Sequence, residues 1–302
     1  MNIIPLLLFS LLGAVEPLGP GDHNRAVQQD GQNRTYLLHI PPKYDPKQPT
    51  PVVLAFHGYA QDASVMVQFC GLSDKADKEG FIVVYPNGSG RIPGMLTWNA
   101  GNCCAYAVRN DVDDVAFTRA LLDDLAQVVK IDAKRVYATG MSNGAMMCYR
   151  LASELSDRIA AIAPVSGPMG MEKCNPQRPV SVMHFHGTDD RIVPFNGGVG
   201  LKILQSPSFY SVEDSIRAWV KADGCPETPV VTNEPEKTDD GTSVQRKTYG
   251  PGKEDSEVVL FVISGGGHTW PGRDAIRFLG TTTHNLWPND LMWKFFKQHP
   301  MK

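Results

Sequence analysis

Short runs of wholly apolar residues alternate along this chain with segments whose apolar residues recur at helical spacing. A run that is apolar at every position is typical of a parallel β-strand buried on both faces. The alternation therefore predicts an α/β fold, with a mostly parallel central sheet and helices on both of its faces. The expected strands lie at 51–56, 81–85, 135–139, 159–165, 182–185 and 258–263, after an alternating strand at 34–40, and the expected helices at 63–78, 113–129, 144–155, 211–222 and 289–297.

One large domain fits the length and composition of the chain. It has 302 residues, of which 42% are hydrophobic, so a sizeable core can be buried. No internal repeat is present, and no linker divides the chain after residue 30. We expect a single domain at 23–302, in which the polar region 233–257 forms a loop or a solvated hairpin.

The N-terminus carries an apolar run, Ile3–Val15, whose length suits the core of a signal peptide. The run is too short to cross a bilayer. The basic residues that usually precede such a core are missing, since the first basic residue is Arg25. We expect residues 1–22 to be a signal peptide and linker and the protein to be secreted or periplasmic; the alternative is a frayed or buried N-terminal segment.

Charge and cysteine content narrow the class of partner. The formal net charge of -3 provides no basic excess for a polyanion, so we expect no nucleic-acid partner. Six cysteines without a C-x-x-C pair argue against a zinc ribbon and agree with disulfides in an exported protein. Because a bridge between adjacent residues is strained, Cys103 and Cys104 are expected to have separate partners. Cys70 and Cys148 fall in helical patterns and are expected to be small buried hydrophobes.

A nucleophile is predicted at Ser142. The apolar run 135–139 leads into Gly140-Met-Ser-Asn-Gly144, and a helical pattern follows. This is the pattern G-x-S-x-G in the strand–turn–helix setting that raises a serine Oγ above a sheet. The flanking glycines prevent clashes with the neighbouring strand and helix. The alternative is a glycine-rich turn with an idle serine.

A serine nucleophile requires a base and an acid that orients the base, in the chain order serine, acid, histidine. Asp189 and Asp190 both follow the run 182–185, and one of them is expected to be only a turn residue. His268 follows three glycines after the last expected strand and is the predicted base. His184 and His186 lie in or beside a strand and are expected to be structural.

An oxyanion hole is expected from two backbone N–H groups. One belongs to Asn143, directly after the nucleophile, and the other to Tyr59, in the loop that follows the strand 51–56. The alternative is that His57-Gly58 merely ends the strand. Trp98 and Trp270 are candidates to line an acyl pocket, against the alternative that both fill the core.

With these residues placed, the chain resembles the secreted polyhydroxybutyrate-depolymerase and feruloyl-esterase-like family of α/β-hydrolases. The resemblance implies the α/β-hydrolase fold, places the acid at Asp190 and implies action on esters of hydroxyalkanoates or of hydroxycinnamic acids attached to plant polysaccharide. It rests on His57-Gly-Tyr59, Phe81-Ile-Val-Val-Tyr-Pro86, Thr97-Trp-Asn-Ala-Gly-Asn-Cys-Cys104, Asp113-Asp-Val-Ala-Phe117, Arg135-Val-Tyr-Ala-Thr-Gly-Met-Ser-Asn-Gly144, His186-Gly-Thr-Asp-Asp190, Val193-Pro194 and Gly265-Gly-Gly-His-Thr-Trp-Pro-Gly272.

The expected function is therefore that of a serine esterase, which hydrolyses small or oligomeric esters through an acyl-enzyme on Ser142. The expected mechanism needs neither a metal nor an organic cofactor, and no stable membrane insertion is expected. Two alternatives stay open: a peptidase of the same fold, and a catalytically inactive binding protein that keeps the shell of the fold.

Overall fold

A ten-stranded sheet forms the centre of the protein in the computed structural model, which describes residues 16–201, 208–274 and 276–302. The apolar run at 3–15 lies outside these residues. The strand order is β1-β2-β4-β3-β5-β6-β7-β12-β11-β10, and two further short strands, β8 and β9, pair with each other. The strands are β1 Gly21–Gln29, β2 Gln32–Ile40, β3 Thr50–Phe56, β4 Ile82–Pro86, β5 Ile131–Met141, β6 Ala161–Val165, β7 Ser181–Gly187, β8 Gly198–Val199, β9 Ser208–Phe209, β10 Val230–Asn233, β11 Ser243–Tyr249 and β12 Val258–Ser264.

The middle of the sheet is parallel and both ends are antiparallel. Strands β4, β3, β5, β6, β7 and β12 run parallel to their neighbours within this group. At one end β2 and β1 add antiparallel to β4, and at the other β11 and β10 add antiparallel to β12. The predicted fold class is confirmed.

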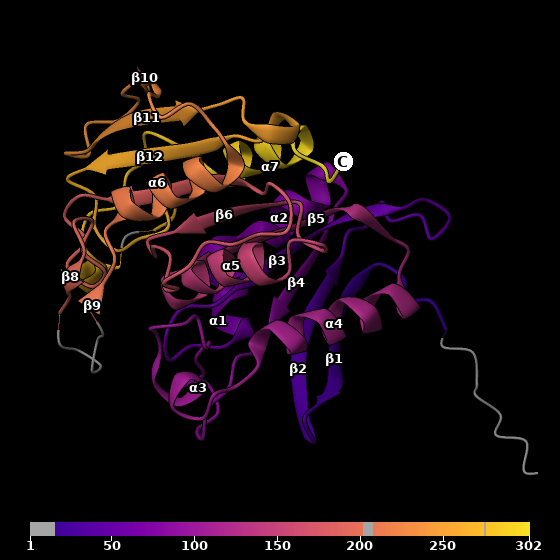
Figure 1. Cartoon of the computed structure of the whole chain (residues 1–302). Helices are drawn as coiled ribbons and strands as arrows, with labels where there is room; N and C mark the ends of the chain where they lie inside the picture. The colour runs from indigo at the N-terminus through magenta and orange to yellow at the C-terminus, as the bar shows by residue number, and fades with distance from the viewer. Residues whose placement is uncertain (1–15, 202–207, 275) are drawn as a thin grey trace, which may run out of the picture.

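Helices cover both faces of the sheet (Figure 1). Side chains alternate along a strand, so Val52 and Leu54 of β3 face one core and Val53 and Ala55 the other. The first core packs against α4, α5 and α6, and the second against α1, α2 and α7. The helices are α1 Ala63–Cys70, α2 Leu72–Glu79, α3 Ala105–Arg109, α4 Asp114–Val128, α5 Asn143–Glu154, α6 Val212–Asp223 and α7 Pro288–Gln298, with short 3-10 turns at Lys253–Asp255 and Arg277–Leu279.

Several elements differ from the sequence prediction, which also lacked the short elements α3, β8, β9 and β10. The strand β1 was not predicted, and it begins at Gly21, before the expected domain start at residue 23. The helix expected at 63–78 is two helices, because Gly71 adopts a left-handed conformation (φ 61°) that ends α1. The polar region 233–257 contains β11, which joins the main sheet between β10 and β12. Its hairpin is therefore part of the sheet.

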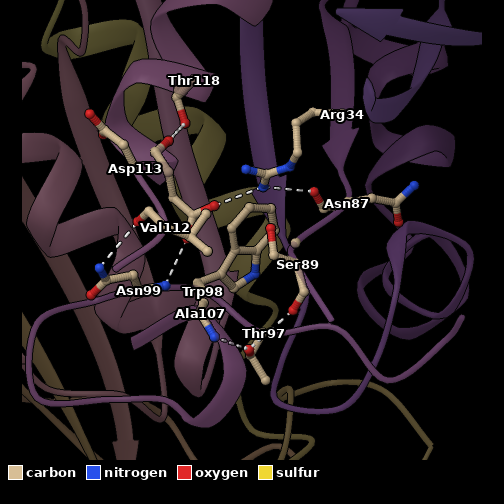
Figure 2. A network of polar contacts seen from close by, with 12 residues as sticks. Arg34, Asn87, Ser89, Thr97, Trp98, Asn99, Ala107, Val112, Asp113 and Thr118 are labelled. Carbon is tan, nitrogen blue, oxygen red and sulfur yellow. Dashed lines mark hydrogen bonds and ion pairs between the residues drawn. The ribbon is translucent and has the colours of Figure 1, made fainter. Parts of the chain in front are cut away.

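A buried ion pair holds the start of α4 against β2. The guanidinium of Arg34 donates to Asp114 at 2.7 Å, and both side chains are nearly inaccessible to solvent. Asp114 also accepts the backbone N–H of Asn99 at 2.7 Å. Figure 2 shows the surrounding contacts, in which Arg34 also reaches the carbonyl of Asn87. The network anchors the loop that contains Trp98 and Asn99, which lies beside the candidate site.

Asp223, the last residue of α6, is a buried carboxylate that opposes stability at neutral pH. One oxygen accepts the N–H of Val180 at 3.1 Å, and the other has no partner among the described residues. Burial raises the pKa of Asp223 from 3.8 to about 7. Because the folded state binds this proton more tightly than the unfolded chain, stability is expected to fall as the pH rises from about 4 through 7.

We expect Asp223→Asn to raise the free energy of unfolding at pH 8 by on the order of 1–3 kcal/mol and to change it little at pH 4, since a pKa unit corresponds to about 1.4 kcal/mol. Urea denaturation at both pH values measures the difference. Asp30→Asn, at an exposed turn, is the control and should show no such pH dependence. An equal effect of Asp223→Asn at both pH values would contradict the prediction.

Candidate active site

Ser142 occupies a sharp turn between β5 and α5. Its backbone has φ 57° and ψ -118°, a conformation that costs energy for a residue with a Cβ and is held here by the surrounding structure. Its N–H donates to the carbonyl of Val165 in β6 at 2.9 Å. A Cβ on Gly144 would lie 2.2 Å from the carbonyl oxygen of Phe56, and one on Gly140 would lie 2.6 Å from the carbonyl carbon of Gly144. Both glycines are therefore required where α5 starts against the end of β3.

Asp190 and His268 come from the loops that follow two adjacent strands, β7 and β12. Nδ1 of His268 lies 2.7 Å from Oδ2 of Asp190, and both side chains are buried. The other oxygen, Oδ1, accepts the backbone N–H groups of Ile192 (2.9 Å) and Val193 (2.8 Å). Burial by itself would raise the pKa of Asp190, but His268, His186 and their hydrogen bonds hold it well below its usual range. The carboxylate is thus ionised and oriented toward the imidazole.

The neighbouring Asp189 lies outside this arrangement. It is exposed, its N–H donates to the carbonyl of Gly266, and its carboxylate accepts the hydroxyl of Thr188. Of the two aspartates between which the residue pattern could not choose, the structure brings Asp190 to His268.

Ser142 and His268 open onto one cavity of about 480 Å³. Tyr59 also lines it, and so do the two adjacent cysteines, Cys103 and Cys104. Much of the remaining wall is apolar and comes from loops and helices around the carboxyl ends of the parallel strands. These apolar residues are Phe69, Val108, Met141, Met146, Ile192, Val193, Leu201, Phe209, Ile276, Phe278 and Leu279.

The loop after β3 directs the N–H of Tyr59. Nδ1 of His57 donates to the carbonyl of Gly58 at 2.7 Å, while its Nε2 accepts the N–H of Gly88 at 3.0 Å. Burial lowers the pKa of His57 to about 4, so the ring is neutral and carries a single N–H. Since C=O and N–H point in opposite directions across a trans peptide, anchoring the Gly58 carbonyl also orients the N–H of Tyr59.

Asn143 presents the second N–H. It is the first residue of α5, where backbone N–H groups have no partner within the helix. Neither its N–H nor that of Tyr59 donates to another group in the described part of the chain. Both donors suit an anion that forms beside Ser142.

Trp98 connects these two donors. Its indole N–H donates to the carbonyl of His57 at 3.0 Å. Its backbone N–H and carbonyl are held by the side-chain amide of Asn143, at 2.8 and 3.0 Å. Trp98 and Trp270 are both buried, and neither lines the cavity. The expected contact of these indoles with an acyl group does not fit these positions, because each is enclosed by protein; the indole N–H of Trp270 donates to Asn289.

We expect Trp98→Phe to lower kcat about 10-fold and to leave KM within about twofold. The N–H groups of Tyr59 and Asn143 remain, but the loop of Tyr59 loses the hydrogen bond from the Trp98 indole to the carbonyl of His57. Removing an oxyanion donor itself costs roughly 100- to 1000-fold in kcat. Steady-state kinetics on p-nitrophenyl acetate measure both constants. Trp293→Phe is the control, since that indole is also buried and donates, at 2.8 Å, to Glu79. Equal losses of kcat in the two variants would contradict a link to the site.

The expectation that Cys103 and Cys104 have separate partners is wrong in this structure. Their sulfurs lie against each other as a disulfide-like pair, and the other four cysteines are free thiols. Cys70 and Cys148 are buried within α1 and α5, as small hydrophobes would be. The Cys103 sulfur also lies 3.9 Å from the amide nitrogen of Asn143. Both cysteines form part of the wall of the cavity that Ser142 also lines.

Sequence reasoning missed the place of His186. It was assigned a structural role, yet its Nε2 lies 3.4 Å from Oδ2 of Asp190. The available signal was its position near the end of the same strand that leads to the acid.

In the described ranges, no group of three or more His, Cys, Asp or Glu side chains has the arrangement of a metal site. No helix described in the structure is long and apolar enough to cross a membrane.

The fold and the strained serine turn define an α/β-hydrolase. The chain belongs to the family described as Esterase PHB depolymerase, whose model matches residues 34–206. The predicted resemblance is confirmed.

Among curated proteins, the chain is 32% identical over 261 residues to the putative esterase NocK of Nocardia uniformis subsp. tsuyamanensis, covering 82% of this chain and 74% of that protein. It is 30% identical over 241 residues to feruloyl esterase B of Piromyces equi, covering 78% of this chain but only 42% of that enzyme. Among solved structures, an acetyl xylan esterase from Aspergillus awamori superposes with a TM-score of 0.62 at 16% identity, over 91% of this chain and 99% of that one. This last likeness concerns the fold.

Proposed function

We propose that this protein is a serine esterase that hydrolyses carboxylic esters through an acyl-enzyme on Ser142. The single observation that carries the proposal is that His268, which is paired with the buried Asp190, lines the same cavity as Ser142 on its strained turn. Membership of an esterase family supports the same reaction class.

The proposed cycle consists of two acyl transfers. His268 accepts the Ser142 hydroxyl proton as Oγ attacks the ester carbonyl, and the N–H groups of Tyr59 and Asn143 stabilise the oxyanion. The protonated imidazole, paired with Asp190, then gives its proton to the leaving alcohol as the ester C–O bond breaks. Water then attacks the acyl-enzyme carbonyl as His268 takes its proton. The bond between the acyl carbon and Oγ breaks, the imidazolium returns the proton to Oγ of Ser142, and the carboxylic acid is released.

The proposed substrates are feruloyl or other hydroxycinnamoyl esters of plant polysaccharide, or hydroxybutyrate oligomers. The largely apolar wall of the cavity, with Phe69, Phe209 and Phe278, suits an aromatic or aliphatic acyl group. One relative is a feruloyl esterase, and another is a bifunctional acetylxylan esterase/xylanase from Neocallimastix patriciarum, of whose length this chain spans 32%.

A hydrolysis panel tests the proposal: methyl ferulate, hydroxybutyrate oligomers, p-nitrophenyl esters of rising length, acetylated xylan and a peptide anilide. We expect turnover of esters with a preference among the acyl groups, and no turnover of the anilide. A peptidase of the same fold would instead cleave the anilide. An inactive binding protein would turn over none of them and would resist labelling by a fluorophosphonate probe.

We further propose that the protein is exported, with residues 1–22 holding a signal peptide and a linker into the mature domain. The apolar N-terminal run supports this assignment. The intact mass of the protein purified from its native host is expected to be smaller than that of the full-length chain by the mass of the removed signal peptide. A full-length intracellular protein would contradict it.

A further inference from the structure

Behind Asp190 lies a chain of three buried polar side chains, Tyr149, His184 and His186. The Tyr149 hydroxyl is 2.9 Å from Nδ1 of His184, and Nε2 of His184 is 3.0 Å from Nδ1 of His186. Nε2 of His186 lies 2.8 Å from the carbonyl oxygen of Val193 and 3.4 Å from Oδ2 of Asp190. None of the three side chains is exposed to solvent. This series of hydrogen-bonded side chains thus ends at Asp190 and at the turn that contains Val193.

The direction of these hydrogen bonds follows from the last acceptor. A carbonyl oxygen only accepts, so Nε2 of His186 carries a proton and donates to Val193. Burial lowers the pKa of His184 well below its usual value, which keeps that ring neutral. A neutral His184 has a single N–H. With that proton on Nε2, Nδ1 of His186 accepts from His184, and Nδ1 of His184 accepts from the hydroxyl of Tyr149. Every ring nitrogen in the chain then has a partner.

His186 contacts both parts of the turn that presents the acid. The N–H of Val193 holds Oδ1 of Asp190, and His186 holds the carbonyl of that same residue. The same imidazole N–H faces Oδ2, the oxygen that receives His268. Loss of this N–H would leave the buried carbonyl of Val193 without its donor. It would also remove one of the two imidazole contacts to Oδ2 of Asp190, which would then be oriented by His268 alone.

The other end of this hydrogen-bonded series, Tyr149, belongs to α5, the helix that follows Ser142. Tyr149 lies seven residues after Ser142, about two turns along α5 and on the same side of that helix. His184 and His186 both belong to β7, on the face of the sheet that α5 covers. The three side chains therefore connect the helix that follows Ser142 with the strand that leads to Asp190.

We propose that His186 is a positioning residue for the Asp190–His268 pair and that Tyr149 and His184 tie it to the nucleophile helix. The proposal rests on the proposed serine esterase function. His186 acts through Asp190 and does not touch the substrate. Its expected signature is a loss in kcat with KM retained, since the cavity wall is unchanged.

The test compares His186→Phe, which keeps a ring but removes the donor, with His186→Gln, whose amide N–H reaches toward the position of Nε2. We expect His186→Phe to lower kcat on p-nitrophenyl acetate about 10-fold with KM within about twofold, well short of the roughly 10,000-fold loss for a triad acid. His186→Gln should restore most of kcat. Tyr149→Phe, at the far end of the chain, should lower kcat by less than His186→Phe does.

Phe185→Leu is the matched control. Phe185 is adjacent to His186 on β7, is equally buried, and packs against Phe261 on the opposite face of the sheet. It is expected to lower the melting temperature without lowering kcat. The positioning role is overturned if His186→Phe keeps the wild-type kcat. It is also overturned if Phe185→Leu, with a melting temperature equal to that of His186→Phe, loses as much kcat as His186→Phe does. If Ser142→Ala still hydrolyses esters, the esterase mechanism is overturned as well. If Ser142→Ala is inactive and His186→Phe keeps the wild-type kcat, only the role of His186 is overturned.

Discussion

Ser142→Ala is expected to lower kcat/KM for p-nitrophenyl acetate by roughly 100,000-fold, because loss of the nucleophile costs about as much as loss of the whole triad in enzymes of this kind. The fold should persist, since the side chain of Ser142 is small and the turn depends on Gly140 and Gly144. Steady-state hydrolysis and far-UV circular dichroism measure the two effects. A fluorophosphonate probe should label the wild type and not the variant.

Ser166 offers a matched control for that substitution. It is a second buried serine with a positive φ (52°), and it directly follows β6, the strand next to β5. It does not line the cavity. Ser166→Ala is expected to hydrolyse esters at close to the wild-type rate. Wild-type hydrolysis by Ser142→Ala, or equal inactivation of both variants, would refute the assignment of the nucleophile.

Asp190→Asn is expected to lower kcat by roughly 1,000- to 10,000-fold, because an amide next to Nδ1 favours the wrong tautomer of the base and does not stabilise the imidazolium. Nδ1 of His268 lies 2.7 Å from the carboxylate that would be neutralised. Since the pKa of Asp190 is held well below its usual range, its ionised form also stabilises the folded state at neutral pH. That stabilisation is lost as the pH falls below about 4 and through the lowered pKa.

The neighbouring Asp189→Asn is the control for Asp190→Asn. It changes the same charge, one residue away, on an exposed side chain that does not reach His268. We expect its kcat to stay within about twofold of the wild type, as for surface substitutions away from the site. If the two variants lost activity equally, a general effect of charge on the loop would explain both, and the role of Asp190 would be withdrawn.

The inner strands were predictable because burial on both faces demands apolar residues at every position. The runs at 51–56, 182–185 and 258–263 all lie within β3, β7 and β12. The strand β1 escaped prediction for the opposite reason. It is an edge strand with mostly exposed polar residues, and its backbone pairs with β2 over its whole length, a bond pattern that leaves no trace in the sequence.

The candidate site was predictable as a set of positions and not as a set of contacts. Ser142 and His268 follow from strand–turn–helix context and chain order, but the residue pattern left Asp189 and Asp190 equivalent, and only the family resemblance favoured one. The two tryptophans show the same limit. A fully buried Trp98 that supports both oxyanion donors and a tryptophan that touches substrate look identical in a sequence.

The sequence by itself determined the fold class, the serine turn and the order of the reactive residues, because apolar periodicity, glycine spacing and chain order are local properties. Tertiary structure alone decided which aspartate meets His268, that Trp98 joins the two oxyanion loops and that His186 stands behind the acid. Each of these depends on hydrogen-bond geometry between residues that lie on different elements or point from different sides of a turn. That geometry exists only once the sheet has set neighbouring strand ends side by side.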